Sequence, residues 1–387
     1  MDTQKLDQTY IANTYARFPV TIVKGKGSLV WDDTGKEYID LSTGIAVDIF
    51  GVADEEWMAA VTKQLGTLQH ISNLYYTEPC VKLAQMLCEK TGMKKVFFGN
   101  SGAEANECAI KAARKWSEEK KGKDYSTIIT LKNSFHGRTI TTLAATGQDV
   151  FHHDFTPLTE GFVYAEPNDL ADLEQLIKAN KCAAVMMEVV QGEGGVMPLD
   201  EAYVKGAAKL CEQYDLLLIC DEVQVGNGRS GKLYGYMHYG VQPEIVSTAK
   251  GLAGGLPLGA TLLGEKVQDV LSAGTHGSTF GGNPVCCAGA INVLSRLDEK
   301  MLEGVEERSA YIIQELAGAK GVLGVSGLGL MLGIQTEKNA SDIIAACREK
   351  GVLVIKAKDK LRLLPALNIP MEQLQKAVAV IKACCAE

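Results

Sequence analysis

The chain has 387 residues, a formal net charge of -8 and a hydrophobic content of 46%, which is typical of a globular protein with a large core. The acidic balance and the scattered lysines argue against a protein that binds nucleic acid. No apolar run is long enough to span a membrane and residues 1–10 are polar, so we expect a cytosolic protein without anchor or signal peptide.

The 11 cysteines and 6 histidines do not show the spacing of metal ligands. No Cys-x-x-Cys occurs, and most cysteines lie inside apolar helix or strand patterns. We therefore predict buried free thiols in a reducing compartment and no metal site.

Residues 1–50 form the first predicted unit. They contain strand-like pieces at 21–23, 27–31 and 38–41, with a turn at 32–35, which indicates a small antiparallel sheet.

From residue 55 the sequence alternates between helical periodicity and short β-rich runs. The β-rich runs are residues 96–98, 127–131, 162–164, 184–188, 216–221, 245–246 and 260–263. Helical patterns at 103–120, 169–179 and 201–214 separate several of them. This alternation predicts an α/β fold in which a mostly parallel, seven-stranded sheet carries helices on both faces and binds ligands beyond the carboxyl ends of its strands.

The last hundred residues predict a second, small α+β unit. A long helical pattern follows residue 285, short strands lie around 325–335 and 352–355, and a closing helix starts at 371. We therefore divide the chain into a large domain of residues 51–285 and a small domain made of residues 1–50 and 286–387.

Lys250 has an unusual sequence context. An apolar run at 245–246 precedes it and a Gly-rich segment containing Pro257 follows, which places the lysine at the end of a buried strand. A lysine surrounded by Ala, Gly and Leu tends towards the lowered pKa that an imine-forming amine needs. Considered alone, the segment fits better a lysine that extends from a Gly-rich loop into solvent.

The segment 99–107 follows a predicted strand and opens a strong helix. Ser101 and Glu104 fit a capping box. The same Gly-rich turn can present free amide groups to an anion, with the Ser101 hydroxyl as a further donor. The two interpretations are compatible.

Asp221 ends a predicted buried strand. Because buried carboxylates are rarely unpaired, it should face a cation, either an arginine of the fold or a protonated ring nitrogen of a cofactor. The following residues 226–231 match the Gly-x-Gly-x-x-Gly pattern of dinucleotide-binding proteins, but the residues after them do not predict a helix, so we discount this match.

Further candidates fall on the same rim of the sheet. Phe135 or His136 could stack on a planar ring and Arg138 could bind a carboxylate, or the loop simply packs an aromatic beside an exposed arginine. The Gly-rich residues 191–195 fit either a turn or part of the site. Arg362 interrupts an apolar run and so needs an anion, which is either a structural carboxylate or a substrate.

These residues together match the needs of pyridoxal phosphate, and the chain resembles the class III (subgroup II) pyridoxal-phosphate-dependent aminotransferases. The resemblance covers nearly the whole chain and rests on residues 30–40, 44–47, 97–107, 135–138, 221–224, 249–251 and 278–284. It implies a fold-type I transferase that acts on small-molecule substrates as a homodimer with shared active sites.

The resemblance also implies a role for each matching residue. Lys250 would hold the cofactor through an imine and move a proton, and Asp221 would keep the pyridine nitrogen protonated. The other cofactor contacts would be Ser101, Gly102, Ala103 and the neighbouring chain's Thr279 at the phosphate, Val223 and Phe135 (or His136) at the ring faces, and Gln224 at the phenolic oxygen.

Substrate-binding residues follow from the same resemblance. Arg138 would bind the α-carboxylate of the amine donor, and Arg362 would bind that of 2-oxoglutarate or glutamate, with Glu193 as its resting partner. Ser278 is expected beside them.

Gly44 bears on the choice of amine donor. Ornithine aminotransferases place a tyrosine at the aligned position, where it binds the head of a free amino acid. A glycine leaves room for an acyl group, so N-acetylornithine is favoured, which implies a step of arginine biosynthesis, and succinylornithine is the hardest rival to exclude.

Other rivals are an ornithine or 4-aminobutyrate transaminase, an aminomutase, and a non-catalytic relative. Arg362 argues against the aminomutase, and the intact pair Lys250 and Asp221 argues against the non-catalytic relative. One segment departs from the family, because its usual Gly-His-x-His-Pro is Gly-Val-Ala-Asp-Glu at 51–55. We expect this change to affect the site entrance or the dimer contact, not the chemistry at the lysine.

Overall fold

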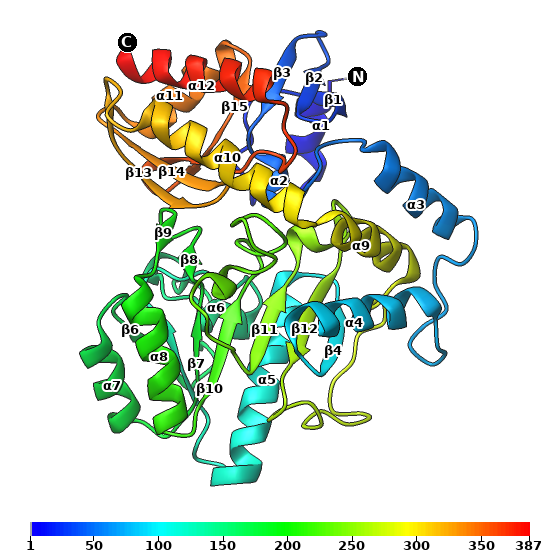
Figure 1. Ribbon diagram of the computed structural model, residues 1–387, viewed down its shortest axis with the longest axis vertical. Helices are drawn as coiled ribbons and strands as arrows, with labels where there is room; N and C mark the ends of the chain where they lie inside the picture. The colour runs from blue at the N-terminus through cyan, green and yellow to red at the C-terminus, as the bar shows by residue number, and fades with distance from the viewer. Residues whose placement is uncertain (1) are drawn as a thin grey trace.

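A seven-stranded sheet forms the centre of the protein in a computed structural model that describes residues 2–387 (Figure 1). Its strands are β4 (Lys95–Gly99), β5 (Thr127–Leu131), β6 (Phe162–Ala165), β7 (Cys182–Met187), β10 (Leu217–Asp221), β11 (Ile245–Thr248) and β12 (Gly259–Leu263). They lie in the order β4-β12-β11-β10-β7-β5-β6. Only β12 runs antiparallel to its neighbours, so the predicted mostly parallel sheet is confirmed.

The central strands are buried on both faces. Every residue of β7, β10, β11 and β12 is buried, which explains why these strands read as continuous apolar runs. Ala184 and Met186 of β7 pack in the core beside α5 (Gly102–Lys121), whereas Val185 and Met187 pack in the core beside α7 (Leu170–Ala179) and α8 (Glu201–Gln213).

The remaining helices and turns of this part of the chain connect or flank the strands. They are α3 (Glu55–Leu65), α4 (Glu78–Thr91), α6 (Ile140–Ala145), η1 (Asp149–Phe151), the hairpin of β8 (Val190–Gln191) and β9 (Met197–Pro198), η2 (Gly235–His238), η3 (Lys250–Ala253) and α9 (Pro284–Arg296). Figure 1 shows α3, α4 and α9 together on one side of the sheet.

The N-terminal and C-terminal segments of the chain both lie above the large sheet in Figure 1. Strands β1 (Ile22–Lys26), β2 (Leu29–Asp32) and β3 (Glu37–Asp40) are antiparallel as predicted, and β15 (Val352–Leu353) adds to them in parallel. A second sheet consists of β13 (Val322–Leu328), β14 (Met331–Thr336), β17 (Lys360–Leu363) and β16 (Ile355–Ala357). The helices of this region are α1 (Thr3–Tyr10), α10 (Glu299–Leu316), α11 (Ala340–Glu349) and α12 (Met371–Ala386).

The short segment α2 (Thr43–Ala46) is a left-handed turn. Its four residues have φ values of 47, 62, 67 and 64°, although only Gly44 lacks a Cβ. Such backbone strain is often found at functional sites, and the next residue, Val47, lines the cavity described below.

No helix within residues 2–387 combines the length and apolar character that crossing a bilayer requires. All 11 cysteines are free thiols, and the described residues hold no cluster of three or more potential metal ligands.

Candidate active site

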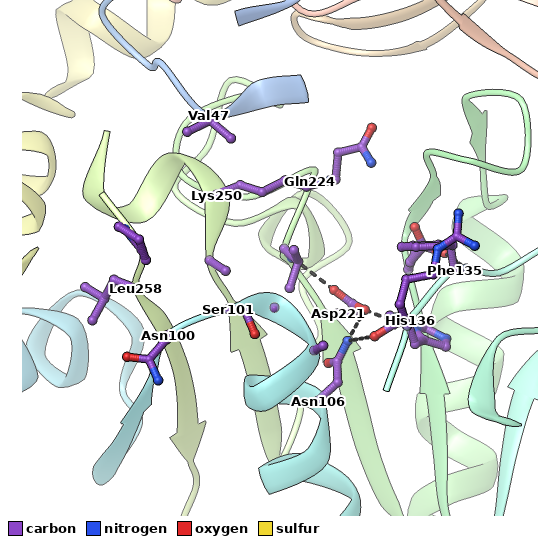
Figure 2. A pocket seen from close by; sticks show the side chains of 18 of the residues that line it. Val47, Asn100, Ser101, Asn106, Phe135, His136, Asp221, Gln224, Lys250 and Leu258 are labelled. Atoms are coloured by element: carbon purple, nitrogen blue, oxygen red, sulfur yellow. Dashed lines mark hydrogen bonds and ion pairs between the residues drawn. The ribbon is translucent and has the colours of Figure 1, made fainter. Parts of the chain in front are cut away.

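A cavity of about 420 Å³ opens at the carboxyl edge of the large sheet (Figure 2). Residues that follow β4, β5, β7, β10 and β11 line it, because parallel strands end at the same edge. Its lining comprises Val47, Asn100, Ser101, Gly102, Ala103, Asn106, Phe135, His136, Gly137, Arg138, Glu188, Asp221, Val223, Gln224, Ala249, Lys250, Gly255, Leu256, Pro257 and Leu258.

Lys250 begins η3, two residues after β11 ends, and its side chain extends along the cavity (Figure 2). Burial lowers the pKa of its amine to about 8, against an opposing influence from the carboxylate of Glu193. The amine has no hydrogen-bond or ion-pair partner within residues 2–387. An unpaired amine of lowered pKa is a suitable nucleophile for a carbonyl group.

Asp221 lies on the floor of the cavity, where it is 3% exposed. Its Oδ2 accepts hydrogen bonds of 2.8 Å from Asn106 Nδ2 and from His136 Nδ1, and its Oδ1 accepts one of 3.0 Å from the Val223 amide. No arginine of the described chain faces it, which removes one of the two explanations that the sequence left open.

The His136 imidazole is bound to Asp221 through Nδ1. The imidazole is buried, and although burial favours its neutral form, the hydrogen bond and charge of Asp221 raise its pKa. The expectation that Phe135 or His136 would face a ring therefore narrows to Phe135.

Asn106 was not identified from the sequence. It lies on α5, and its amide also donates to the His136 carbonyl at 2.8 Å, so it braces both members of the pair. A polar residue on the Ala-rich, buried face of a helix was the available signal.

The N-terminus of α5 borders the cavity and presents unpaired amides. Ser101 caps the helix, since its Oγ accepts a bond of 3.2 Å from the Glu104 amide. The carboxylate of Glu104 accepts from the amide and side chain of Asn100, one residue before the position expected for a capping box. The amides of Gly102 and Ala103 have no partner inside the helix, so they can bind an anion together with the Ser101 hydroxyl.

Glycine is required at position 102 by its neighbour. A Cβ on Gly102 would lie 2.6 Å from Cγ1 of Val223, which is closer than packed side chains allow. Val223 therefore packs directly against the start of α5, while its amide donates to the Asp221 carboxylate.

Phe135 and Arg138 lie on the loop after β5. The guanidinium of Arg138 is exposed and lies 5.4 Å from the Phe135 ring centroid and 4.3 Å from that of Phe151. It forms no hydrogen bond or salt bridge with any side chain or carbonyl of residues 2–387. It is therefore available to a carboxylate.

Glu188, which follows β7, is a further cavity residue without an assigned role. Its carboxylate accepts bonds from the amides of Phe135 at 2.8 Å and Gly192 at 3.3 Å, so it joins two loops of the site. Burial raises its pKa to about 7.

Arg362 and Glu193 form an ion pair above the cavity. Arg362 Nη1 lies 2.6 Å from Glu193 Oε1 and donates to Gln224 Oε1 at 3.0 Å. Arg362 is on β17 and 3% exposed, so its charge requires this partner. Burial alone would raise the pKa of Glu193, but the charge of Arg362 lowers it overall.

Five predicted site residues do not line the cavity of their own chain: the ion pair of Glu193 and Arg362, and Thr279, Ser278 and Gly44. Thr279 is exposed, and Ser278 lies behind the cavity wall, where its Oγ accepts from Asn100 Nδ2 at 3.1 Å. Gly44 is exposed in the left-handed turn, and a Cβ there would contact nothing closer than 3.7 Å. The roles of these residues stay predictions.

Residues 10–385 match the family model of the class-III aminotransferases. The chain belongs to this family. Acetylornithine aminotransferase of Haemophilus ducreyi is 49% identical over 99% of this chain and 98% of its own length. Succinylornithine transaminase of Salmonella newport is 42% identical over 97% and 94%. A structure of the Toxoplasma gondii ornithine aminotransferase, with pyridoxal phosphate partly occupying its active site, superposes with a TM-score of 0.95, at 33% identity over 100% and 94%.

This class III aminotransferase uses pyridoxal phosphate, and the cavity fits that cofactor. The unpaired amine of Lys250 suits its aldehyde, and the amides at the start of α5 suit its phosphate. The Asp221 carboxylate lines the same cavity and has no cationic partner in the described chain except His136, so it suits a protonated ring nitrogen. The discounted dinucleotide pattern at 226–231 forms turns and no helix, as expected from the sequence.

Proposed function

We propose that this enzyme transfers the terminal amine of N-acetylornithine to 2-oxoglutarate, giving N-acetylglutamate 5-semialdehyde and glutamate, a step of arginine biosynthesis. The observation that carries the proposal is the pair of guanidinium groups beside one reactive lysine. Arg138 lines the cavity with Lys250 and has no ion-pair partner in the described chain, whereas Arg362, whose charge lowers the pKa of Lys250, pairs with Glu193. Each substrate carries a carboxylate, and a guanidinium binds carboxylates through two parallel hydrogen bonds.

The residues at the cofactor have separable tasks. When bound, pyridoxal phosphate supplies the aldehyde that accepts the amine and the ring that delocalises the electron pair of the reacting carbon. Lys250 attaches the cofactor and moves a proton to and from the reacting carbon. Asp221, held in place by His136 and Asn106, keeps a proton on the ring nitrogen.

The remaining contacts orient the cofactor. Ser101, Gly102 and Ala103 would bind its phosphate, and Phe135 and Val223, which line the cavity, would pack on its ring. The side-chain amide of Gln224 would donate to the phenolic oxygen, while its oxygen accepts from Arg362.

Substrate carboxylates bind at the two arginines. Arg138 binds the α-carboxylate of N-acetylornithine and the distal carboxylate of glutamate. Arg362 binds the α-carboxylate of 2-oxoglutarate, for which Glu193 must release it. Gly44 leaves space for the acyl group, and Ser278 fixes Asn100 at the cavity wall.

We also propose a homodimer in which Thr279 completes the neighbouring chain's phosphate site. Thr279 lies beside the loop of residues 70–76, since Asn73 Nδ2 donates to the Ser278 carbonyl at 3.1 Å. The two loops expose large apolar side chains, with Tyr76 at 99%, Leu74 at 84% and Phe280 at 60% exposure. Such a patch is typical of a protein interface. Co-expression of Lys250→Ala and Thr279→Asp chains tests this arrangement, because a hybrid dimer would regain one intact site. Absence of any recovered activity would count against a shared site.

The visible spectrum of the purified holoenzyme tests the proposed reaction. The cofactor band should bleach with N-acetylornithine and return with 2-oxoglutarate, while Lys250→Ala should not turn over. Bleaching by ornithine or 4-aminobutyrate but not by N-acetylornithine would overturn the substrate assignment. Succinylornithine is the second candidate substrate, since a relative named succinylornithine transaminase aligns with 97% of this chain. The ratio of the kcat/KM values for N-acetylornithine and succinylornithine decides between the two.

A further inference from the structure

Within residues 2–387 the guanidinium of Arg138 contacts aromatic rings and has no hydrogen-bond or ion-pair partner. It lies 4.3 Å from the centroid of Phe151 and 5.4 Å from that of Phe135, and both distances are within the range of cation–π attraction. An exposed arginine without such contacts would sample many rotamers. A guanidinium that rests on a ring face keeps its N–H edge free, so stacking and carboxylate binding are compatible.

Phe151 is itself fixed relative to the loop that carries Arg138. The two rings Phe135 and Phe151 pack edge to face, with centroids 5.8 Å apart and planes at 76°. Phe151 ends η1, and the residues just before η1 are bonded to the Arg138 loop. The Gly147 amide donates to Ser134 Oγ at 3.0 Å, and Gln148 Nε2 donates to the Ser134 carbonyl at 3.0 Å.

Two further hydrogen bonds make this support rigid. The Asn133 amide donates to the Gly147 carbonyl at 2.7 Å, and the His136 amide donates to Thr146 Oγ1 at 2.9 Å. Position 147 also excludes any side chain, because a Cβ there would lie 2.0 Å from the Leu131 carbonyl oxygen. The segment leading to Phe151 is thus hydrogen-bonded to residues on both sides of Phe135.

We propose that Phe151 is a positioning residue for substrate carboxylates, acting through Arg138. This inference rests on the proposed function, in which Arg138 binds a carboxylate in both half-reactions. The ring of Phe151 holds the guanidinium at the cavity mouth before substrate arrives, so that binding does not have to order a long side chain. It therefore favours substrates that carry a carboxylate at the end remote from the reacting amine.

The test compares Phe151→Leu, which removes the ring but keeps an apolar side chain, with Phe151→Tyr, which keeps the ring. The probe is glutarate, which has the carbon skeleton of 2-oxoglutarate but cannot react, and its Kd for the holoenzyme is measured by calorimetry. A lost cation–π contact corresponds to a weakening of roughly 2- to 30-fold. We expect Phe151→Leu to fall in that range and Phe151→Tyr to stay within about twofold of the wild type.

Two further measurements separate positioning from a general structural effect. Phe151→Leu should raise KM for N-acetylornithine with little change in kcat, and the Kd of pyridoxal phosphate for the apoprotein should not change. In an Arg138→Ala background, adding Phe151→Leu should produce no further loss of glutarate affinity, because the two residues act as one unit.

Three results would overturn the role of Phe151. They are unchanged glutarate binding in Phe151→Leu, an equal loss of glutarate affinity when Phe151→Leu is added to Arg138→Ala, and a parallel loss of cofactor affinity. If glutarate binding weakens as expected but N-acetylornithine is no substrate, the proposed function fails and the positioning of Arg138 by Phe151 stands.

Discussion

Replacement of Lys250 by methionine is expected to stabilise the cofactor-free protein. Burial lowers the pKa of this amine from 10.5 to about 8. The unfolded chain then binds the proton more tightly than the folded chain, so the lysine costs folding free energy wherever the unfolded amine is charged. Methionine has similar length and volume and removes the charge, while any strain from the φ of 47° at this position persists in both proteins.

The size of the effect follows from the two pKa values. Their difference of about 2.5 corresponds to about 3 kcal/mol at pH 7, where the penalty is complete. The penalty falls as pH rises from 8 towards 10.5, and at pH 9.5 about 1.4 kcal/mol remains. These figures are upper limits, because the amine faces a cavity that solvent enters.

Urea unfolding of both apoproteins at pH 7 and pH 9.5, with a thiol reductant, measures this difference. The advantage of Lys250→Met should be about half as large at the higher pH. The exposed Lys63 provides a matched control, since Lys63→Met should change the transition at neither pH. An advantage that is equal at the two pH values would show that packing, not charge, is responsible, and the reasoning would be wrong.

Three other substitutions test separate parts of the site. Gly102→Ala places a methyl group 2.6 Å from Val223 Cγ1 and should weaken pyridoxal phosphate binding to the apoprotein by about tenfold, whereas unchanged affinity in a titration would contradict the close contact. Arg296→Met removes the partner of Asp54, at 2.5 and 3.0 Å, and should lower the free energy of unfolding by about 2 kcal/mol at pH 7. Because the arginine lowers the Asp54 pKa against the effect of burial, this loss should shrink as pH falls below 3.8, which unfolding curves at acid pH would reveal. Glu193→Gln removes a negative charge that raises the pKa of Lys250. The reaction of the apoprotein with pyridoxal phosphate should therefore have its midpoint at a lower pH. A midpoint at a higher pH would refute the effect of Glu193 on Lys250.

The positions of Lys250 and Asp221 could be predicted because they follow strand ends. Parallel strands with apolar sequences end at one edge of a sheet, so residues just beyond them converge whatever the loops do. The structure places both residues at one cavity with Ser101 and Gly102. Local sequence was sufficient for this part of the site.

Contacts made by loops could not be predicted in the same way. His136 and Asp221 are 85 positions apart, and nothing in either segment indicates that the imidazole lies under the carboxylate. Phe151 lies in a polar segment between strands, and its place against Arg138 depends on hydrogen bonds to the neighbouring loop. The strand β17 was also missed, since its four residues were interpreted only as an apolar run interrupted by Arg362.

Residues 51–55, which differ from the family's usual Gly-His-x-His-Pro, still make contacts that lead to the turn of Lys250. Asp54 caps α3 by accepting from the Trp57 amide at 2.9 Å, and it binds Arg296 of α9, so the segment joins two helices. One turn further along α3, the indole Nε1 of Trp57 donates to the Ala253 carbonyl at 3.0 Å, at the end of the turn that Lys250 begins. A series of hydrogen bonds through α3 therefore connects Asp54 with the turn that contains Lys250, although this segment lacks the family's histidines and proline. Loss of the Asp54 contacts should consequently disturb the site through the position of η3 and not through direct contact with either substrate.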